Sequence, residues 1–176
     1  VDNSSAFRME AAVPLVVPEV NPAAAEQHQG VIANPNCSTI IMLTALAPLH
    51  RAVPITRIHA ATYQAASGGG QAMMDELLAS TRAHLAGEPF TPQQLPFSYA
   101  FNLFPHNAPW DERQGMCEEE QKMIRETHKM LDPAIRVHAT CVRVPVLRTH
   151  AEALNVTFAE ELSVEQADAL LRAAPG

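Results

Sequence analysis

Apolar side chains recur at helical spacing in several segments of the chain. After the three consecutive glycines, for example, Met74, Leu77, Leu78 and Leu85 recur at intervals that bring them to one side of a helix. The same reasoning, applied along the whole chain, predicts helices over residues 38–51, 71–85, 118–131 and 163–174.

Two of these helices carry further local signals. Pro48 lies inside the first one and has no N–H to donate, so we expect it to end or kink that helix. Ser163 stands just before the last one and is followed three positions later by Gln166, which is the pattern of a capping box.

Runs rich in β-branched and aromatic residues indicate strands between the helices. We predict strands over residues 13–20, 31–33, 56–63, 135–146 and 154–158, and a long proline-rich loop over 87–111. Pro14 and Pro18 confine the first run to a sheet edge or an extended loop. Strands and helices interleave, and the long loop favours an α+β fold over a regular series of βαβ units.

Composition narrows the class of protein. The chain has 176 residues, which suits one domain, and its 47% apolar and 18% charged residues exclude a disordered chain. Three cysteines are too few for a disulfide scaffold, and they favour the cytoplasm. The net charge of −7 argues against binding to nucleic acid or anionic lipid, and no apolar run is long enough to span a membrane.

A cysteine at a predicted helix start is the first candidate for catalysis. Cys37 lies between a predicted strand and a predicted helix, in the sequence N-P-N-C-S-T. A helix N-terminus lowers the pKa of a thiol, and its unpaired N–H groups can stabilise an oxyanion. An isolated cysteine is, however, more often a small buried apolar residue. The local pattern leaves both interpretations open.

A nucleophilic thiol needs a base, and the chain has eight histidines. None of them has the spacing of a zinc site, so we expect no metal. His150 stands out because Arg143 precedes it by seven residues, which would place a base near a carboxylate-binding guanidinium. Glu119 and Lys122, three positions apart, look by themselves like an ordinary solvated pair on a helix.

Six motifs in order give these residues a context. Together they resemble the aspartate-β-semialdehyde dehydrogenase family over essentially the whole chain. The motifs are V-D-N-S-S-A-F-R-M, N-P-N-C-S-T, T-Y-Q-A-A-S-G, A-F-N-x-x-P-H, E-E-E-x-K-M-x-x-E-T and C-V-R-V-P-V-x-x-x-H.

The resemblance implies a fold. It implies a mixed, largely antiparallel sheet with helices on one face, similar to the C-terminal domain of glyceraldehyde-3-phosphate dehydrogenase. Residues 1–176 would form a single catalytic and dimerisation domain, part of a longer two-domain enzyme. In this family the sheet packs against its copy in a partner subunit, so a homodimer or tetramer is expected.

The resemblance also implies a reaction. Such enzymes use NADPH to convert β-aspartyl phosphate to aspartate semialdehyde and phosphate through a cysteine acyl-enzyme, on the route to lysine, threonine and methionine. No G-x-G-x-x-G follows a strand in this chain. We therefore expect a separate dinucleotide domain to hold most of the NADP, and this chain alone to bind it too weakly to detect.

Carried over by position, five residues match groups around the reacting carbon and the amino-acid end of the substrate. Cys37 matches the acylated nucleophile and His150 the general acid/base. Gln64 matches the side chain that orients the acyl intermediate. Arg143 matches the group that binds the substrate α-carboxylate, and Glu119 the carboxylate that pairs with its amino group.

Five more residues match groups around phosphate and cofactor. Arg8 and Lys122 match phosphate-binding cations, and Asn36 matches a side-chain donor near the phosphate. Ser67 and Gly68 match backbone contacts to the nicotinamide half of NADP.

Two alternatives are weighed against this interpretation. A non-catalytic relative of the same fold would usually have lost at least one of the catalytic residues, yet all of them are present. A reductase of a related acyl phosphate, such as N-acetylglutamyl phosphate, would have no charged amino group for Glu119 to pair with. The combination of Glu119 and Arg143 therefore favours a substrate with a free amino-acid end.

Overall fold

The computed structural model describes residues 1–176, and the chain forms two compact units. Each unit is assembled from segments that lie far apart in the sequence. The first unit comprises Val1–Ala60, Glu120–Ala139 and Glu152–Gly176, and the second comprises Ala61–Glu119 and Thr140–Ala151.

A four-stranded sheet has the strand order β2-β5-β1-β6. Its strands are β1 (Ile55–Gln64), β2 (Phe104–Pro105), β5 (Arg136–Arg143) and β6 (Ala151–Phe158). The short strand β2 pairs with β5 in antiparallel fashion, with Phe104 opposite Arg143. A two-residue pair, β3 (Trp110–Asp111) and β4 (Met116–Cys117), is also antiparallel. The predicted α+β class with a largely antiparallel sheet is confirmed.

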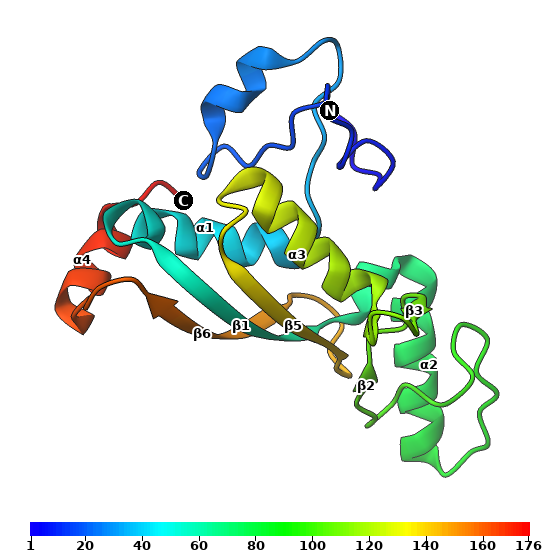
Figure 1. The fold of residues 1–176 in the computed structure, drawn as a ribbon. Coiled ribbons are helices and arrows are strands. Elements are labelled where there is room, and N and C mark those ends of the chain that lie inside the picture. Colours follow the sequence, from blue (N-terminus) through cyan, green and yellow to red (C-terminus); the bar gives the residue numbers. More distant parts are fainter. The chain divides into compact units, whose positions relative to one another are not determined.

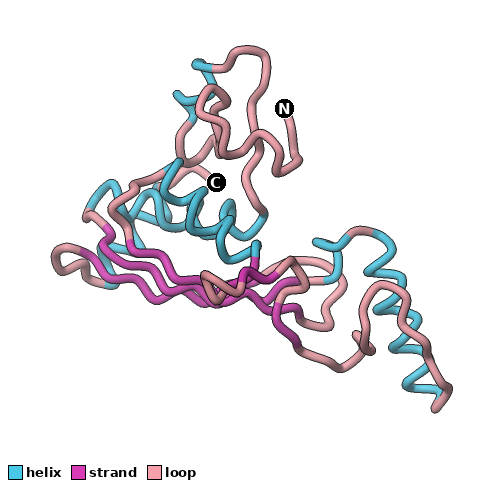
Figure 2. Tube along the Cα trace, turned by 45° about the vertical axis from the view of Figure 1, so that its right-hand side comes forward, coloured by secondary structure: helices cyan, strands magenta, loops and turns pink.

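In the first unit, helices cover one face of the strands. Helix α1 (Cys37–Ala52) and helix α3 (Glu118–Met130), from Glu120 onward, lie on the same side of the sheet (Figures 1 and 2). Helix α4 (Val164–Ala173) packs beside α1. Side chains from α1, β1 and α3, together with Ile135 just before β5, are almost completely buried in this unit: Met42, Leu43, Ile58, Met123 and Ile135. The predicted placement of helices on one face is therefore confirmed.

The second unit has its own smaller core around helix α2 (Gln71–Ala86). The proline-rich segment folds back onto this helix and buries Leu95, Tyr99 and Phe104 against Met73 and Leu77. The Tyr99 hydroxyl donates a hydrogen bond to the Val144 carbonyl, 3.0 Å away, directly after β5. The long loop is thus packed in place despite its lack of long regular elements.

The four predicted helices are all present, with ends displaced by only a few residues. Of the two effects expected of Pro48, it does not end the first helix, because α1 continues to Ala52. Proline removes one hydrogen bond near the end of the helix, while the adjacent Leu46, Ala47 and Leu49 are buried and hold the last turn. The capping box of Ser163 and Gln166 at the start of α4 is confirmed.

Two runs predicted as strands form none, and for residues 13–20 the structure has the loop that the prolines left as the alternative. Residues 13–20 and 31–33 form no strand, because their pairing is limited to single bridges of Ala33 with Leu15 and with Asp2. Pro14 and Pro18 lack the N–H groups that a longer ladder needs. The segment is nevertheless part of the core, with Leu15 and neighbouring valines buried.

Other boundaries also differ from the sequence prediction. The strand expected over 135–146 ends at Arg143, two residues before Pro145, and the strand expected over 154–158 begins earlier, at Ala151. The proline-rich loop contains the short strands β2 and β3. Two short 3-10 helices, η1 (Pro22–Gln27) and η2 (Ala66–Gly69), were not predicted.

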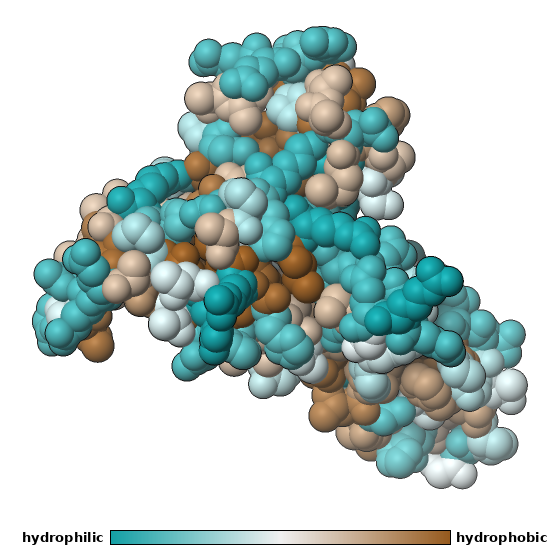
Figure 3. Space-filling view, viewed as in Figure 1, coloured by the Kyte–Doolittle hydropathy of each residue, from teal (hydrophilic) through white to brown (hydrophobic).

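Apolar side chains also reach the surface. On the face shown in Figure 3, hydrophobic residues form separate patches among hydrophilic ones. Several of the most exposed large apolar side chains of the second unit lie on the proline-rich segment, namely Phe101, Leu103 and Trp110. Each helix is too short or too polar to cross a bilayer.

Candidate active site

The first unit places Cys37 at the first position of helix α1. Asn36 caps this helix, and its side-chain oxygen accepts hydrogen bonds from the N–H groups of Ser38 and Thr39 at 3.0 and 3.3 Å. The sequence suggested that the N–H groups at this helix start are unpaired, but these two are already bonded to Asn36. The Cys37 side chain is exposed, whereas Cys117 and Cys141 are buried. The accessible thiol is thus the one that the sequence selected.

Arg8 belongs to the same unit as Cys37 and is buried, with only 9% of its surface exposed. Its Nη1 lies 3.1 Å from Oε1 of Glu126 on α3, and its Nη2 donates to the Asn3 carbonyl. The other oxygen of Glu126 accepts the Asn36 N–H at 2.7 Å. Burial raises the pKa of Glu126, while the Asn36 N–H and the Arg8 charge act in the opposite direction. Arg8 and Asn36 therefore meet at one carboxylate.

Lys122 lies on α3 one turn before Glu126, so the two side chains leave the same face of the helix. The predicted phosphate-binding group of Arg8, Asn36 and Lys122 thus belongs to a single unit, together with Cys37.

The second unit holds His150 by its ring nitrogen Nδ1. The Ala65 N–H donates to Nδ1 at 3.1 Å. Because an amide nitrogen can only donate, Nδ1 is the acceptor and the neutral ring carries its proton on Nε2. Burial lowers the pKa of His150, and the Arg143 charge lowers it further, against the opposing effect of Glu119. The residue before it, Thr149, has a φ of 70°, a costly conformation for a β-branched residue.

Arg143 lies at the end of β5, with 4% of its surface exposed. Its Nη1 donates to the Ala65 carbonyl at 2.8 Å, and its Nε donates to the side-chain oxygen of Asn107 at 3.2 Å. Both backbone polar groups of Ala65 are therefore used: its N–H donates to His150 and its carbonyl accepts from Arg143. The Nη2 end of the guanidinium has no protein partner and remains able to bind a carboxylate.

Gln64 and Glu119 are buried together in the same unit. The Gln64 side-chain nitrogen donates to Oε1 of Glu119 at 3.0 Å, and its oxygen accepts the Thr62 hydroxyl at 2.9 Å. These two bonds fix which end of the Gln64 amide faces Glu119. Nε2 of His106 lies 3.9 Å from the same Glu119 oxygen.

The turn that contains Ser67 and Gly68 approaches His150 and Arg143 closely. A Cβ added to Gly68 would lie 2.9 Å from Nη1 of Arg143 and 3.1 Å from Nε2 of His150, so a side chain has no room there. The Ser67 N–H donates to the Leu147 carbonyl at 2.9 Å. A contact from Ser67 to a cofactor would therefore use its hydroxyl or its carbonyl.

Sequence reasoning missed several residues that hold these groups. Asn107 follows the P-H of the A-F-N-x-x-P-H motif, which gave a signal for this position. Glu126 lies four residues after Lys122, a spacing that marks a shared helix face. Ala65 acts through its backbone, and no side-chain pattern could have revealed it. Nowhere do three or more His, Cys, Asp or Glu side chains gather as they would around a metal ion.

Two family models match parts of the chain. Residues 46–176 match the semialdehyde dehydrogenase dimerisation domain, and residues 1–28 match the semialdehyde dehydrogenase NAD-binding domain.

The chain is also similar to curated aspartate-semialdehyde dehydrogenases. It is 55% identical to the one from Synechocystis over 100% of this chain and 52% of that protein, and 42% identical to the one from Bacillus subtilis over 100% and 53%. The chain thus spans about half the length of the curated relatives it matches.

Solved structures show the same similarity. Aspartate semialdehyde dehydrogenase II from Vibrio cholerae, complexed with ASA, matches with a TM-score of 0.96 and 44% identity over 99% of this chain and 53% of that one. A probable aspartate-semialdehyde dehydrogenase from Pseudomonas aeruginosa matches with a TM-score of 0.88 at 21% identity, over 95% of this chain and 51% of that one, which shows the shared fold.

Proposed function

The chain belongs to the semialdehyde dehydrogenase dimerisation-domain family, and on this premise we propose that it is the catalytic part of an aspartate-semialdehyde dehydrogenase. In the proposed reaction, β-aspartyl phosphate is reduced by NADPH to aspartate semialdehyde and inorganic phosphate. This reaction lies on the route to lysine, threonine and methionine.

The observation that carries the proposal is the pair of opposite charges buried in the second unit. Arg143 and Glu119 are 4% and 5% exposed, and neighbouring groups hold both rigidly. Buried charges are costly unless they are paired or used. A guanidinium with one unpartnered end suits an α-carboxylate, and a carboxylate suits an ammonium group. Together they would recognise the charged end of a free amino acid.

The first chemical step would take place at Cys37. Its thiolate attacks the acyl carbon of β-aspartyl phosphate, a carbon–sulfur bond forms, and the carbon–oxygen bond to phosphate breaks. Phosphate leaves with the electron pair of that bond. Arg8, Lys122 and the Asn36 side-chain amide would hold the phosphate oxygens and stabilise their charge. The buried Nε–H of Arg8, which has no protein partner, supports a role in anion binding.

His150 would act at the oxygen of the reacting carbon. In the neutral form that the Ala65 N–H favours, Nε2–H can donate a hydrogen bond to a developing oxyanion. To act as a general acid the ring must take up a second proton at Nδ1, which breaks its bond to Ala65. Gln64 would orient the acyl group from the Glu119 side.

The cofactor, when bound, would supply the hydride as NADPH and accept it as NADP in the reverse direction. Ser67 and Gly68 would contact its nicotinamide end. The tight approach of the Gly68 backbone to His150 supports this, because a residue without a side chain leaves the reacting region open. The match of residues 1–28 to an NAD-binding domain and a Candida albicans relative described with NADP also support a nicotinamide cofactor.

We also propose that the protein works as a homodimer or tetramer. The match to a dimerisation domain supports self-association. The exposed Phe101, Leu103 and Trp110 of the proline-rich segment are the kind of side chains that interfaces bury.

The test uses the natural full-length protein, assayed with β-aspartyl phosphate and, separately, with N-acetylglutamyl phosphate. We expect turnover of the first substrate only, and Cys37→Ser should abolish it because a hydroxyl is a far weaker nucleophile than a thiolate. Mass spectrometry without NADPH should find an acyl group on Cys37. Preference for the acetylated substrate, or activity of Cys37→Ser within about tenfold of wild type, would contradict the proposal.

A further inference from the structure

One face of helix α3 carries three charged side chains in sequence. Lys122, Glu126 and Lys129 are four and three residues apart, so they project from the same face over two turns. All three belong to the first unit. Lys122 is assigned above to phosphate binding, whereas nothing in the proposed reaction uses the other two.

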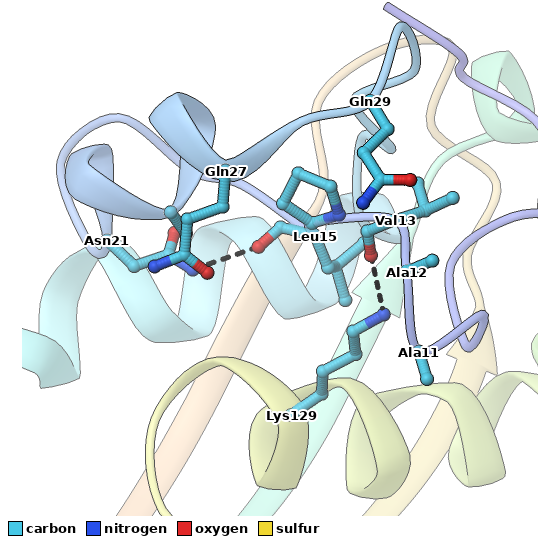
Figure 4. Close-up of a pocket in the computed structure, with 10 residues that line it drawn as sticks. Ala11, Ala12, Val13, Leu15, Asn21, Gln27, Gln29 and Lys129 are labelled. Carbon is cyan, nitrogen blue, oxygen red and sulfur yellow. Dashed lines mark hydrogen bonds between the residues drawn. The ribbon is translucent and has the colours of Figure 1, made fainter.

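Lys129 holds the backbone that carries Arg8. Its Nζ donates to three carbonyl oxygens, those of Arg8, Glu10 and Val13, at 2.7, 2.8 and 2.9 Å. An ammonium group has three N–H donors, so all of them are used. Figure 4 shows Lys129 reaching the Val13 carbonyl at one end of a cavity of about 360 Å³. Residues 8–13 are therefore fastened to α3.

Glu126 makes the second connection, and it joins two different segments. One oxygen contacts Nη1 of Arg8 and the other accepts the backbone N–H of Asn36. Asn36 is the cap of α1 and directly precedes Cys37. The carboxylate is 1% exposed, so no water competes for these contacts from the bulk. One side chain thus sets the distance between a phosphate-binding cation and the turn that presents the thiol.

We propose that Glu126 is a positioning residue that keeps the phosphate-binding Arg8 and the Cys37 turn in register, without itself touching the substrate. The proposal rests on the function proposed above. Sulfur adds to and phosphate leaves from the same acyl carbon, through one tetrahedral intermediate, so the thiol and the phosphate-binding groups must be placed together. A displacement of about 1 Å is enough to lower turnover by about a hundredfold.

This role predicts a particular kinetic signature for Glu126→Gln. Glutamine keeps the size and can still accept the Asn36 N–H, but it no longer neutralises Arg8. We expect kcat to fall about 10- to 100-fold, while inorganic phosphate inhibits as strongly as before or more strongly, because Arg8 keeps its charge and loses its competitor. A purely structural role would instead weaken phosphate binding and turnover together with a lower melting temperature.

The experiment measures kcat, KM and inhibition by inorganic phosphate in the full-length protein for wild type, Glu126→Gln, Arg8→Ala and the double variant. Glu26→Gln, an exposed carboxylate in the same unit, is the matched control and should resemble wild type. The double variant should be no worse than Arg8→Ala alone, because the two residues act as one group. Independent, multiplying losses, or an unchanged kcat in Glu126→Gln, would overturn the proposal.

Failure of the two proposals can be told apart. If Arg8→Ala leaves phosphate inhibition unchanged, the phosphate site itself is misplaced. If Arg8→Ala weakens phosphate inhibition while Glu126→Gln leaves both kcat and phosphate inhibition unchanged, only the positioning role of Glu126 is refuted. Should Glu126→Gln fold poorly, Glu126→Asp keeps the charge but is one methylene too short to reach both partners, and a lower kcat with retained phosphate inhibition is again the expected result.

Discussion

The Ala65 peptide shows how a residue with no functional side chain can organise a site. Its N–H selects the protonated nitrogen of His150, and its carbonyl fixes Nη1 of Arg143. Gly68 also borders this region, since a Cβ at this position would lie 2.9 Å from Nη1 of Arg143 and 3.1 Å from Nε2 of His150. Backbone groups therefore place the two side chains that we propose to act on the substrate, and changes in backbone packing should affect catalysis directly.

Gly68→Ala adds a single carbon atom and tests whether backbone packing at this position affects catalysis. The added Cβ would lie 2.9 Å from Nη1 of Arg143 and 3.1 Å from Nε2 of His150, so at least one of them must move. We expect kcat/KM for β-aspartyl phosphate to fall about 10- to 100-fold. Gly69→Ala is the control, because the three atoms nearest to its Cβ all belong to the Met73 side chain and none to His150 or Arg143, and it should cost much less. Equal losses in the two variants would show that crowding at His150 and Arg143 is not the cause.

Glu152 on β6 predicts a pH-dependent stability. Both of its carboxylate oxygens are buried without a hydrogen-bond partner, and burial raises the pKa of Glu152 from 4.5 to about 8. The folded protein therefore holds this proton at pH values where the unfolded chain has lost it. Stability from this group is present below pH 4.5 and is lost as the pH rises through about 8.

Glu152→Gln removes the ionisation and should therefore stabilise the protein at high pH. We expect a gain of about 1 kcal/mol near pH 8, discounted because the residue is only partly buried, and little difference near pH 4.5. Thermal melts of variant and wild type across this range measure it. A difference in melting temperature that does not change with pH would show that ionisation of Glu152 plays no part.

At the scale of elements, helices differ in what holds them. Helix α1 buries residues such as Met42 and Leu43 and tolerates Pro48 near its end. Helix α4 buries no residue completely, although it packs beside α1. The stability of α4 should therefore depend strongly on its capping box. The stability of α1, which has a buried face, should depend less on any single local contact.

Ser163→Ala should destabilise α4 locally. Loss of this cap removes the acceptor for the Gln166 N–H and should cost about 1 kcal/mol. Hydrogen exchange in the first turn of α4 should become faster, while exchange in α1 stays unchanged. Asp168→Asn, which breaks an exposed ion pair with Arg172 in the same helix, is the control and should have a smaller effect. The reverse order would mean that the surface ion pair, and not the cap, holds the helix.

The sequence predicted elements well where the local pattern is strong and poorly where distant segments decide. Helices with clear periodicity were found, and so was the capping box of Ser163. The strand expected at residues 13–20 failed because pairing depends on a neighbour, and the prolines limit it to one bridge with Ala33. Motifs singled out Arg8 and Arg143, but Glu126 and Asn107 lie 118 and 36 residues away from them, so these pairings became visible only in the folded chain.

At the scale of the whole molecule, we propose that the exposed apolar side chains of the proline-rich segment take part in self-association, in line with the match to a dimerisation domain. Leu103 is 63% exposed and Trp110 is 59% exposed, both on the proline-rich segment. That segment is anchored from beneath by Tyr99 and Phe104, so its outer side chains are held in place before any partner arrives. A preordered apolar surface loses little entropy on association.

Leu103→Ser should weaken self-association. If a second copy covers this segment, we expect the dissociation constant to rise about tenfold, and sedimentation velocity at micromolar concentration to show more of the smaller species. Leu85→Ser makes the same change at a leucine outside the segment that is more exposed, at 74% against 63%, and should leave the distribution unchanged. If both variants associate like wild type, another surface forms the dimer.

The shared face of α3 also limits how the gene can change over evolution. One residue inserted between Lys122 and Glu126 would turn the following part of the helix by about 100°. Glu126 would then face away from Arg8 and Asn36, and Lys129 away from the carbonyls that it holds. Point mutations on the other faces of α3 leave this arrangement intact, whereas any insertion or deletion within these two turns breaks it at once. Descendants of this sequence should therefore vary in the identity of residues along α3 but keep the number of residues from Lys122 to Lys129 constant.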